Sequence, residues 1–466
     1  MLKNKIVLLI SLFFTIISIA KEYNITSYGA KNDGKTINTI AVQKAIDDCS
    51  KNGGGTVRID GGGTYVIGTI FMKSYVTMHI ANGTVLQGST NQNDYVGNVH
   101  KNMYKGEVTK NNCLIYAENA VSFGFEGYGT IDGNGHLENF PKKGVIQRPM
   151  LLRFKDCSEI SMRDIHLINP ASWTSAWLYC NNITIDGITI KSRANFNGDG
   201  LDFDGCTNVR VSNSSFDNSD DCICLQTSLP DKPCKNITIT NCNFTTKWAG
   251  IRIGLLSRGN IEYVTVSNCT FTDIEDSGLK IQQNEGGEMS NMTFTNLVME
   301  NVPRPIFMTF CQQTASVETP EGQMEPLKRM HNIKFSNIIA DNSKGDKNSA
   351  IFITGIPGHA IEDVSISNVD FIVSGGGTLQ EAKQIDVKEY TFDNMKRWPE
   401  FYVVGALPVY GIYARHINGL NLDAISIKTN SEDKRAPVIL NSVTNAHFYN
   451  LKTNGKVLES TEVLRQ

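Results

Sequence analysis

Four aspartates within a short stretch of the chain have the residue type and spacing for acid–base chemistry. They form two groups, Asp199 with Asp202 and Asp220 with Asp221. Like charges held close together disfavour joint ionisation, which can raise the pKa of one member. One carboxyl can then stay protonated as an acid while its neighbour stays a base. The two groups can serve one reaction only if the fold brings them together.

An apolar alternation aligns the two groups. Four segments superpose, with offsets of 22, 28 and 28 residues: Leu201–Phe203, Ile223–Leu225, Ile251–Ile253 and Leu279–Ile281. Side chains alternate faces along a strand, so the apolar residues point inward and the residue between them points outward. Residues in the same register stack at the strand spacing of about 4.8 Å. The outward ladder is then Asp202, Cys224, Arg252 and Lys280.

Residues at the neighbouring positions of the same four segments are expected to lie beside this ladder. Aligned positions hold Asp199, Asp221, Ala249 and Ser277, then Gly198, Asp220, Trp248 and Asp276, and on the other side Asp204, Gln226, Gly254 and Gln282. Strict alternation would send Asp199 and Asp221 inward, where unpaired carboxylates are costly. We therefore expect the chain to be still turning there, with all four aspartates aimed outward on adjacent coils. Calcium suits oxygen-only clusters, but Arg252 and Lys280 would repel it, so we expect no metal and no cofactor.

A repeat of about 27 residues organises these elements. Each copy alternates apolar and polar residues, as in Asn208–Asn213, Asn236–Asn241 and Tyr263–Asn268. Most copies end in Asn, which tolerates the left-handed conformation of a sharp corner. This predicts an all-β fold, a right-handed parallel β-helix, with a turn ladder of Asn213, Asn241, Asn268 and Asn296. A β-propeller, the alternative, needs about 40 residues per blade.

Three segments lie outside the repeat. Residues 1–20 have a basic start, an apolar run over Ile6–Ile19 and a small-residue cleavage site, which predicts a secretory signal peptide and a secreted or periplasmic protein. Ala41–Ser50 is predicted to be a helix capping the open end of the solenoid. The aromatic-rich stretch 373–415 interrupts the repeat, either as a packed loop on the solenoid flank or as a wall that stacks sugars. Residues 21–466 are expected to form one domain.

Composition narrows the function classes. The net charge of −3 and the lack of a basic cluster argue against nucleic-acid binding. No later segment could span a membrane, and we expect a monomer. The 11 cysteines are odd in number and lack zinc-ligand spacing. We expect mostly buried thiols, with one or two bridges.

The motifs resemble those of glycoside hydrolase family 28, the polygalacturonase-like pectin hydrolases, over essentially the whole mature chain. Asn197-Gly198-Asp199 matches the Asn-x-Asp motif of the family, and Asp220-Asp221-Cys222 matches its Asp-Asp-Cys motif. The stretch 407–416 resembles bacterial members. The resemblance implies hydrolysis with inversion, Asp220 as general acid, and Asp199 and Asp221 holding the attacking water. Inversion needs room for that water, so we expect carboxyl separations of about 6.5–9.5 Å.

Two motifs of the family differ here. Its Gly-His-Gly falls on Trp248-Ala249-Gly250, and its Arg-Ile-Lys, which grips a galacturonate, falls on Lys280-Ile281-Gln282. Three interpretations follow. The enzyme acts on a different α-linked sugar or on a mixed pectic backbone such as rhamnogalacturonan, or it is an ordinary polygalacturonase whose galacturonate-binding residues are arranged differently. The third interpretation is that the protein is inactive.

An acidic plant-type polysaccharide or oligosaccharide is the expected partner. The candidate substrate-binding residues are Asn197, Asp202, Trp248, Arg252, Lys280 and Gln282. We expect the Arg252 and Lys280 side chains to point into a substrate groove beside the four aspartates. Two other hypotheses remain open. One is a polysaccharide lyase that uses Arg252 or Lys280 as its base, and the other is a glycan-binding solenoid without catalysis.

Overall fold

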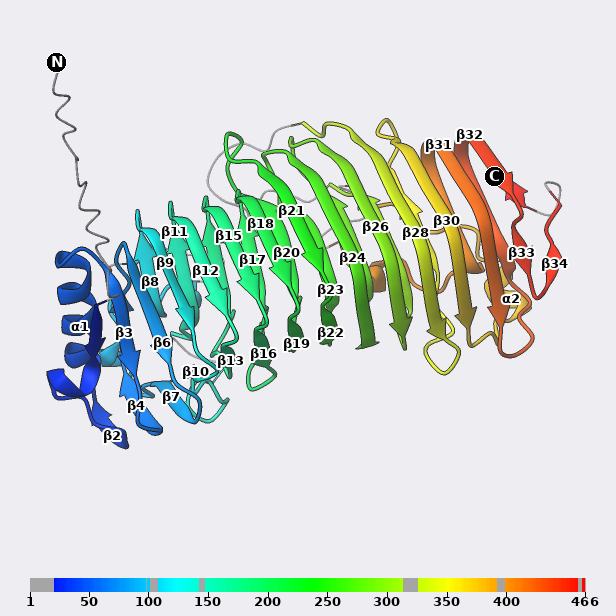
Figure 1. Cartoon of the computed structure of the whole chain (residues 1–466). Helices are drawn as coiled ribbons and strands as arrows, with labels where there is room; N and C mark the ends of the chain where they lie inside the picture. The colour runs from blue at the N-terminus through cyan, green and yellow to red at the C-terminus, as the bar shows by residue number, and fades with distance from the viewer. Residues whose placement is uncertain are drawn as a thin grey trace, which may run out of the picture.

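The computed structural model describes residues 21–97, 99–100, 108–141, 147–312, 326–391, 399–459 and 463–465. The predicted signal peptide, residues 1–20, lies outside them. The described chain winds into an elongated right-handed parallel β-helix whose coils stack along one axis (Figure 1). The predicted fold class is thereby confirmed, and a propeller is excluded.

Each coil contributes strands to three parallel rows. Row 1 holds β1 (Glu22–Asn24), β3 (Gly55–Ile59), β6 (Val76–Ile80), β9 (Val121–Glu126), β12 (Ser158–Arg163), β15 (Asn181–Asp186), β18 (Thr207–Ser212), β21 (Cys234–Thr240), β24 (Ile261–Ile274), β26 (Met289–Glu300), β28 (Met330–Asn342), β30 (Ile361–Val373), β31 (Val409–Thr429) and β32 (Ala436–Tyr449). Row 2 holds β2 (Asp33–Ile37), β4 (Gly63–Ile67), β7 (Thr84–Gly88), β10 (Thr130–Asp132), β13 (His166–Ile168), β16 (Thr189–Ser192), β19 (Ser215–Asn218) and β22 (Asn243–Thr246), and continues in the second halves of the long row 1 strands from β24 to β31 and then in β33 (Lys452–Thr453).

Row 3 carries the candidate site. Its strands are β5 (Ile70–Phe71), β8 (Cys113–Glu118), β11 (Met150–Lys155), β14 (Ser175–Leu178), β17 (Leu201–Asp204), β20 (Ile223–Thr227), β23 (Ala249–Ser257), β25 (Ser277–Gln283), β27 (Arg304–Phe310) and β29 (Ile351–Thr354), followed by the first parts of β31 and β32 and by β35 (Leu464–Arg465). β33 pairs antiparallel with β34 (Lys456–Val457) near the C-terminus. Short 3-10 helices are η1 (Ile25–Tyr28), η2 (Gln92–Asp94), η3 (Val108–Lys110) and η4 (Phe401–Val403).

The predicted ladder is present in row 3. Asp202 pairs with Cys224, Cys224 with Arg252, and Arg252 with Lys280. The flanking apolar residues, such as Leu201 and Phe203, are fully buried in the core. Side-chain alternation therefore places the four ladder residues on the opposite face from the core.

The predicted turn ladder is also confirmed. Asn213, Asn241, Asn268 and Asn296 have φ between +52° and +56°. Their amides bond from coil to coil, with Asn241 Nδ2 donating to Asn213 Oδ1 at 3.4 Å and Asn296 Nδ2 to Asn268 Oδ1 at 3.0 Å. Asn serves these corners because its short polar side chain tolerates the left-handed conformation and bonds locally.

A helix covers the N-terminal end of the solenoid (Figure 1), as predicted. α1 spans Thr39–Lys51, two residues longer at its start and one at its end than expected. It buries Val42, Ala45, Ile46 and Cys49, which recur at the spacing of one helical face. The chain then leaves the helix through Gly53, Gly54 and Gly55, all with positive φ.

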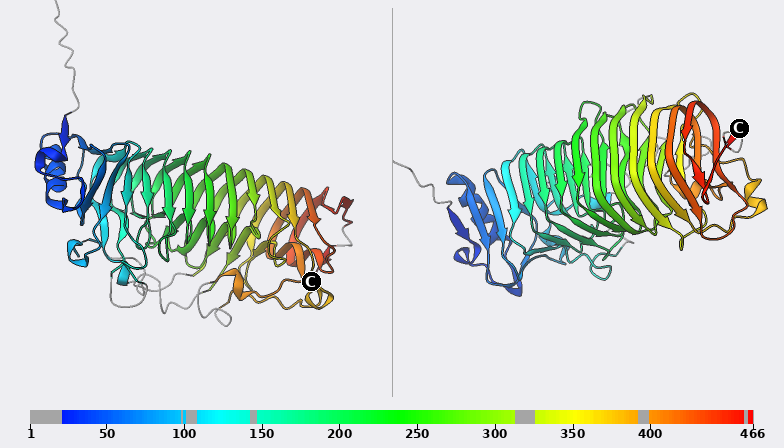
Figure 2. Two further views of the ribbon diagram at one scale, coloured as in Figure 1. Left: turned by 90° about the horizontal axis from the view of Figure 1, so that it is seen from below. Right: turned by 45° about the vertical axis from the view of Figure 1, so that its right-hand side comes forward.

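The interruption of the repeat is shorter than predicted. It runs between β30 and β31, so residues 409–415 belong to a strand. The segment 374–408 is here called the insertion. Its described residues, 374–391 and 399–408, contain α2 (Leu379–Ala382) and η4 and lie along one side of the solenoid (Figure 2). Tyr390 and Phe401 pack edge-on against Phe307 of row 3, which confirms the packed-loop interpretation for these rings. Tyr402 is exposed, and Phe392 and Trp398 lie outside the described residues.

All 11 cysteines are buried free thiols, so the expectation of one or two bridges was wrong. They behave as small buried apolar residues. Among the described residues, no helix is long and apolar enough to cross a membrane.

Candidate active site

Three aspartates meet where the chain enters two successive row 3 strands. Asp199 precedes β17, and Asp220 and Asp221 precede β20, so the chain is still turning at these positions, as expected. The Gly200 N–H donates to the Asp221 carbonyl at 2.9 Å and ties the two coils together. One carboxylate oxygen from each aspartate lies within 4.8 Å of the others.

The expected separation of about 6.5–9.5 Å refers to whole carboxyl groups. The nearest oxygens of Asp199, Asp220 and Asp221 are closer than that range. The reason is the fold, because adjacent coils of a parallel sheet stack only about 4.8 Å apart. Carboxylates on neighbouring coils that point the same way therefore stay near each other.

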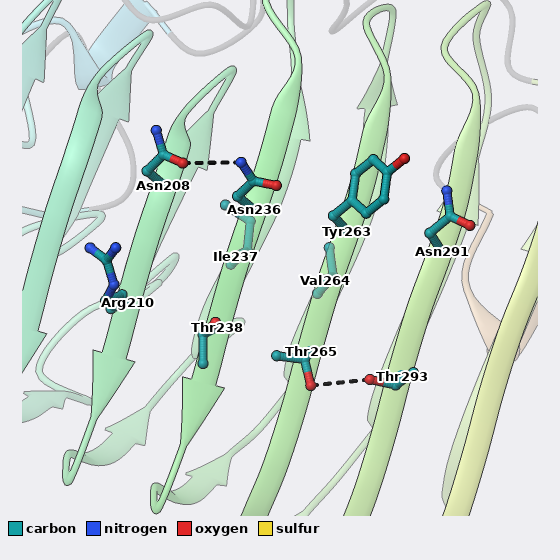
Figure 3. A pocket seen from close by; sticks show the side chains of 10 residues that line it. All are labelled: Asn208, Arg210, Asn236, Ile237, Thr238, Tyr263, Val264, Thr265, Asn291 and Thr293. Carbon is teal, nitrogen blue, oxygen red and sulfur yellow. Dashed lines mark hydrogen bonds between the residues drawn. The ribbon is translucent and has the colours of Figure 1, made fainter.

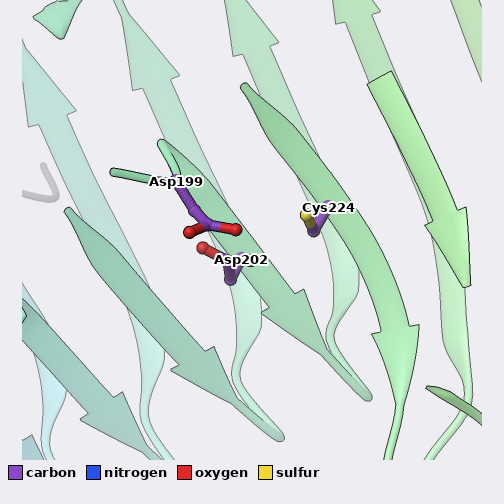
Figure 4. A group of neighbouring side chains, drawn as sticks. All are labelled: Asp199, Asp202 and Cys224. Carbon is purple, nitrogen blue, oxygen red and sulfur yellow. The ribbon is translucent and has the colours of Figure 1, made fainter. Parts of the chain in front are cut away.

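Asp199 and Asp202 form the buried side of the cluster. Their side chains lie next to each other, with Cys224 on the adjacent strand (Figure 4). Oδ1 of Asp199 and Oδ2 of Asp202 are buried without a hydrogen-bond partner. Burial raises the pKa values of both carboxyls well above the usual range for aspartate, and the neighbouring carboxylates raise these pKa values further.

Asp220 is the half-buried member. Its Oδ1 accepts from the backbone N–H of Asp221 at 3.0 Å, and Nδ2 of Asn197 lies 3.5 Å from its Oδ2. Burial and then the negative charge of Asp221 raise the pKa of Asp220 to about 7, although Lys110 and Arg252 oppose this shift. A carboxyl with this pKa still carries a proton near neutral pH, as a general acid must.

Asp221 is held from the next coil. Its Oδ1 accepts from the Ala249 N–H at 3.0 Å, and its Oδ2 accepts from Arg252 Nη1 at 3.0 Å. The contact from Ala249 is made by a backbone amide, so it does not depend on the side chain at that position. Arg252 thus binds a member of the cluster.

The expectation that the Lys280 side chain points into an open groove was wrong. Lys280 is fully buried, with Nζ 3.0 Å from Asp276 Oδ2 and in contact with Oε2 of Glu400 in the insertion. Burial acts to lower the pKa of Lys280, but the carboxylates of Asp276 and Glu400 outweigh it and raise the pKa. The insertion therefore covers this cation.

The other two candidates next to Lys280 differ in exposure. Gln282 is fully buried, and its Nε2 donates to the Pro399 carbonyl at 2.6 Å. It therefore anchors the insertion, which corrects its expected role in substrate binding. Trp248 remains half-buried, with Lys280 Nζ 5.1 Å from the centre of its ring.

Sequence analysis missed Glu400, Arg148 and Lys110. Arg148 Nη2 donates to Asn197 Oδ1 at 2.9 Å, which positions the asparagine beside Asp220. The charge of the buried Lys110 lowers the pKa of Asp220. All three lie outside the repeat, so no register position marked them, although the interruption of the repeat pointed to the segment that contains Glu400.

The geometry also permits two metal-ligand groups, Asp199–Asp202–Cys224 and Asp199–Asp220–Asp221. The first contains a thiol and so is not the oxygen-only set that calcium prefers. In the second, the Arg252 guanidinium already binds Asp221, and its positive charge opposes a cation.

A depression of about 410 Å³ lies on row 1 (Figure 3). It is lined by Asn208, Arg210, Asn236, Ile237, Thr238, Tyr263, Val264, Thr265, Asn291 and Thr293. This lining includes no carboxyl group, so it offers neither an acid nor a base. This depression is therefore not a candidate for acid–base catalysis.

Comparison with known proteins identifies the family of this chain. Residues 49–391 match the model of glycosyl hydrolases family 28. The chain is 24% identical over 446 residues to an exo-poly-alpha-D-galacturonosidase of Dickeya chrysanthemi, covering 82% of this chain and 72% of that protein. It is 28% identical over 282 residues to a probable rhamnogalacturonase A of Aspergillus oryzae, covering 60% and 54%.

A solved structure shares the fold. The family 28 exopolygalacturonase of Yersinia enterocolitica superposes with a TM-score of 0.68 at 21% identity, covering 95% of this chain and 79% of that one. The family match spans both aspartate motifs, Trp248 and Lys280. The chain belongs to glycosyl hydrolases family 28 and is a glycoside hydrolase.

Proposed function

We propose that this protein hydrolyses an α-glycosidic bond in a pectic polysaccharide or oligosaccharide of the galacturonan or rhamnogalacturonan type. Family membership supports the reaction class, and relatives named for galacturonan and for rhamnogalacturonan support the substrate class. The signal-peptide pattern supports a secreted or periplasmic location. A monomer suffices, because one chain supplies every residue proposed here.

The observation that carries the proposal is the unequal environment of three neighbouring carboxyls. Asp220, whose pKa is raised to about 7, is proposed to protonate the glycosidic oxygen. Asp221, which accepts from Arg252 and the Ala249 amide, is proposed to hold the attacking water together with Asp199. Neighbouring carboxyls in different environments divide the acid and base roles in this way.

Substrate positioning is proposed for groove residues that remain accessible. Trp248 offers an aromatic face to a sugar ring, and Asn197 lies beside the acid. Asp202 lies beside Asp199 and is only 2% exposed. We therefore propose that it supports Asp199 rather than contacting sugar.

A lyase is not favoured. Its base would have to be Arg252 or Lys280, but both are ion-paired, and the raised pKa of Lys280 keeps its proton bound. Arginine is protonated throughout the range in which enzymes work.

The test is a reducing-end assay across galacturonan and rhamnogalacturonan fractions, with near-ultraviolet absorbance followed in parallel. Hydrolysis predicts new reducing ends with no unsaturated product. A product that absorbs in the near ultraviolet would instead identify a lyase, and binding without new reducing ends would identify a non-catalytic glycan-binding protein.

A further inference from the structure

The row 1 depression has a lining suited to binding a ligand rather than to catalysis (Figure 3). Its volume of about 410 Å³ lies within the range of ligand sites, roughly 300–1,000 Å³. Strands β18, β21, β24 and β26 supply its residues, and side chains alternate between the core and the outside along each strand. Ile237 and Val264 are buried in the core. The outward lining therefore consists of an arginine, a tyrosine, amides and hydroxyls.

Tyr263 interrupts a column of asparagines in this lining. At the same corner, the two preceding and the two following coils have asparagines with φ between +53° and +59°: Asn208, Asn236, Asn291 and Asn332. Tyr263 adopts the same left-handed conformation at +57°, which is unfavourable for a bulky residue. It is also 51% exposed, so core packing does not account for the ring. A bulky residue kept in an unfavourable conformation on the surface points to a role in binding.

The tyrosine also interrupts hydrogen bonds between the corner amides. Asn236 Nδ2 donates to Asn208 Oδ1 at 3.0 Å (Figure 3), and on the other side of the tyrosine Asn332 Nδ2 donates to Asn291 Oδ1 at 2.7 Å. Tyr263 does not continue this pattern, and within the described part of the chain no group donates to Asn236 Oδ1. An exposed amide oxygen beside an exposed ring can accept from a hydroxyl group of a ligand.

Two cations accompany the ring. Lys235 Nζ lies 5.0 Å from the ring centre of Tyr263 and 2.9 Å from Oε1 of Glu262. Arg210 is exposed, and among the residues that the structure describes no carboxylate pairs with it. Arg210 and Tyr263 lie two coils apart, so about 10 Å separates them along the solenoid axis. This distance exceeds the width of one sugar ring.

We infer that the row 1 depression is a second glycan-binding site, which takes an acidic oligosaccharide of at least two sugar units. One sugar ring stacks on Tyr263, and a uronate carboxylate pairs with Arg210, whose guanidinium can bind it through two hydrogen bonds. The free oxygen of Asn236 and the outward hydroxyls of Thr265 and Thr293 bind sugar hydroxyls.

The ligand class follows from the charge of Arg210 and rests on the proposed function, which supplies an acidic polysaccharide. The site itself goes beyond that function. Its strands belong to row 1, whereas the catalytic aspartates precede strands of row 3. Since its lining has no carboxyl group, the site holds the glycan and takes no part in cleaving it.

The test is hydroxyl-radical footprinting of tyrosines, followed by mass spectrometry of the full chain carrying Asp220→Asn, which keeps the ligand intact. The two ligands are α-1,4-trigalacturonate and its methyl ester, which carry a carboxylate and a neutral ester at C6. Trigalacturonate, titrated into the millimolar range, should lower the labelling of Tyr263 at least about twofold above its dissociation constant, because more than half of the sites are then occupied. The ester should protect Tyr263 less at the same concentration. Tyr449, which is 76% exposed at the end of β32 in row 1, is the internal control and should not be protected.

Arg210→Gln should remove the preference for the acidic ligand. The dissociation constant of trigalacturonate, measured from the protection of Tyr263, should rise by about two- to fivefold, the scale of an exposed ion pair, while that of the ester stays the same. The matched control is Arg193→Gln, which removes an exposed arginine paired with Asp217 near row 2. It should leave both dissociation constants unchanged.

Tyr263→Asn gives a second, independent measurement. It places the residue of the neighbouring coils at this corner, so the fold should be retained. In calorimetric titrations of Asp220→Asn chains with trigalacturonate, the variant should bind one ligand fewer per chain. An unchanged stoichiometry would overturn the inference, and so would a Tyr263 that trigalacturonate does not protect or that the ester protects equally well.

The reducing-end assay of the wild-type protein tests the proposed function separately. Hydrolysis of pectic fractions without protection of Tyr263 would overturn only the second site. Protection of Tyr263 without hydrolysis would overturn only the proposed catalytic function.

Discussion

Nη1 of Arg252 lies 3.0 Å from Oδ2 of Asp221, so an arginine of the outward row 3 ladder binds a carboxylate of the aspartate cluster. Asp221 directly precedes β20 and Arg252 lies on β23, the adjacent row 3 strand one coil further along. Arg252 therefore links the acid–base cluster to the buried network of Glu400 and Lys280. The predictions below follow from that linkage and from the burial of the aspartates.

Replacing the proposed acid should remove most of the activity. We expect Asp220→Asn to lower kcat by at least about 10²-fold, the usual scale for acid–base groups, because the amide cannot protonate the leaving oxygen. Reducing-end assays measure this on the best pectic substrate. Asp217→Asn, an exposed aspartate on β19 paired with Arg193, is the control and should keep its activity. Near-normal turnover of Asp220→Asn would refute the assignment.

The pH profile should show the titration of Asp220. Burial and Asp221 raise its pKa to about 7, and only the protonated form can act as the acid. Activity should therefore fall as the pH rises through about 7. In Arg252→Gln the loss of a positive charge raises the pKa of Asp220 further, so this alkaline limb should move to higher pH. Arg163→Gln, a change at the end of β12 on row 1, should not move it.

Asp202→Asn should stabilise the protein in a pH-dependent way. The folded-state pKa of Asp202 is raised, so the protonated carboxyl favours folding at low pH and that contribution is lost as the pH rises through the folded pKa. The gain from the amide should be about 1–3 kcal/mol at pH 8, the usual cost of an unsatisfied buried polar group, and smaller at pH 5. Urea unfolding at both pH values measures this, and an equal gain at both would contradict the raised pKa.

Lys280→Met should destabilise the fold rather than only weaken substrate binding. Removing one partner of a buried ion pair costs about 3–5 kcal/mol. Here Glu400 loses its nearer cation and keeps only Arg252, whose Nη2 lies 3.8 Å from Oε1. Adding Glu400→Gln should restore part of the lost stability. A double-mutant cycle of unfolding free energies tests this coupling, and additive effects of the two substitutions would show that the pair does not interact.

The stereochemistry of hydrolysis should be inversion. An α-linked substrate should release the β-anomer first, which proton NMR can observe in the first minutes before mutarotation. The close spacing of Asp199, Asp220 and Asp221 makes this measurement necessary, because carboxyl separations near 5 Å are typical of retaining enzymes. Initial release of the α-anomer would reject inversion.

The repeating part of this protein could be predicted from local patterns. Alternation along each strand and the constant spacing between coils determine which residues share a ladder, so Asp202, Cys224, Arg252 and Lys280 were aligned correctly. The corner asparagines and the capping helix likewise follow from residue type and short-range spacing. Predicting that the aspartates converge needed only one further assumption, namely that the chain is still turning before each of these strands begins.

The burial and ion pairing of the ladder residues depended on the insertion, which is not part of the repeat. Lys280 and Gln282 face away from the core as predicted, but the insertion packs over both and brings Glu400 into contact with Lys280, 120 residues away in the chain. Neither alternation nor coil spacing specifies where an irregular loop packs. The sequence by itself therefore determined the solenoid and the positions of its aspartates, whereas the tertiary structure alone decided which groove charges are neutralised, because long-range packing of the insertion controls burial and ion pairing.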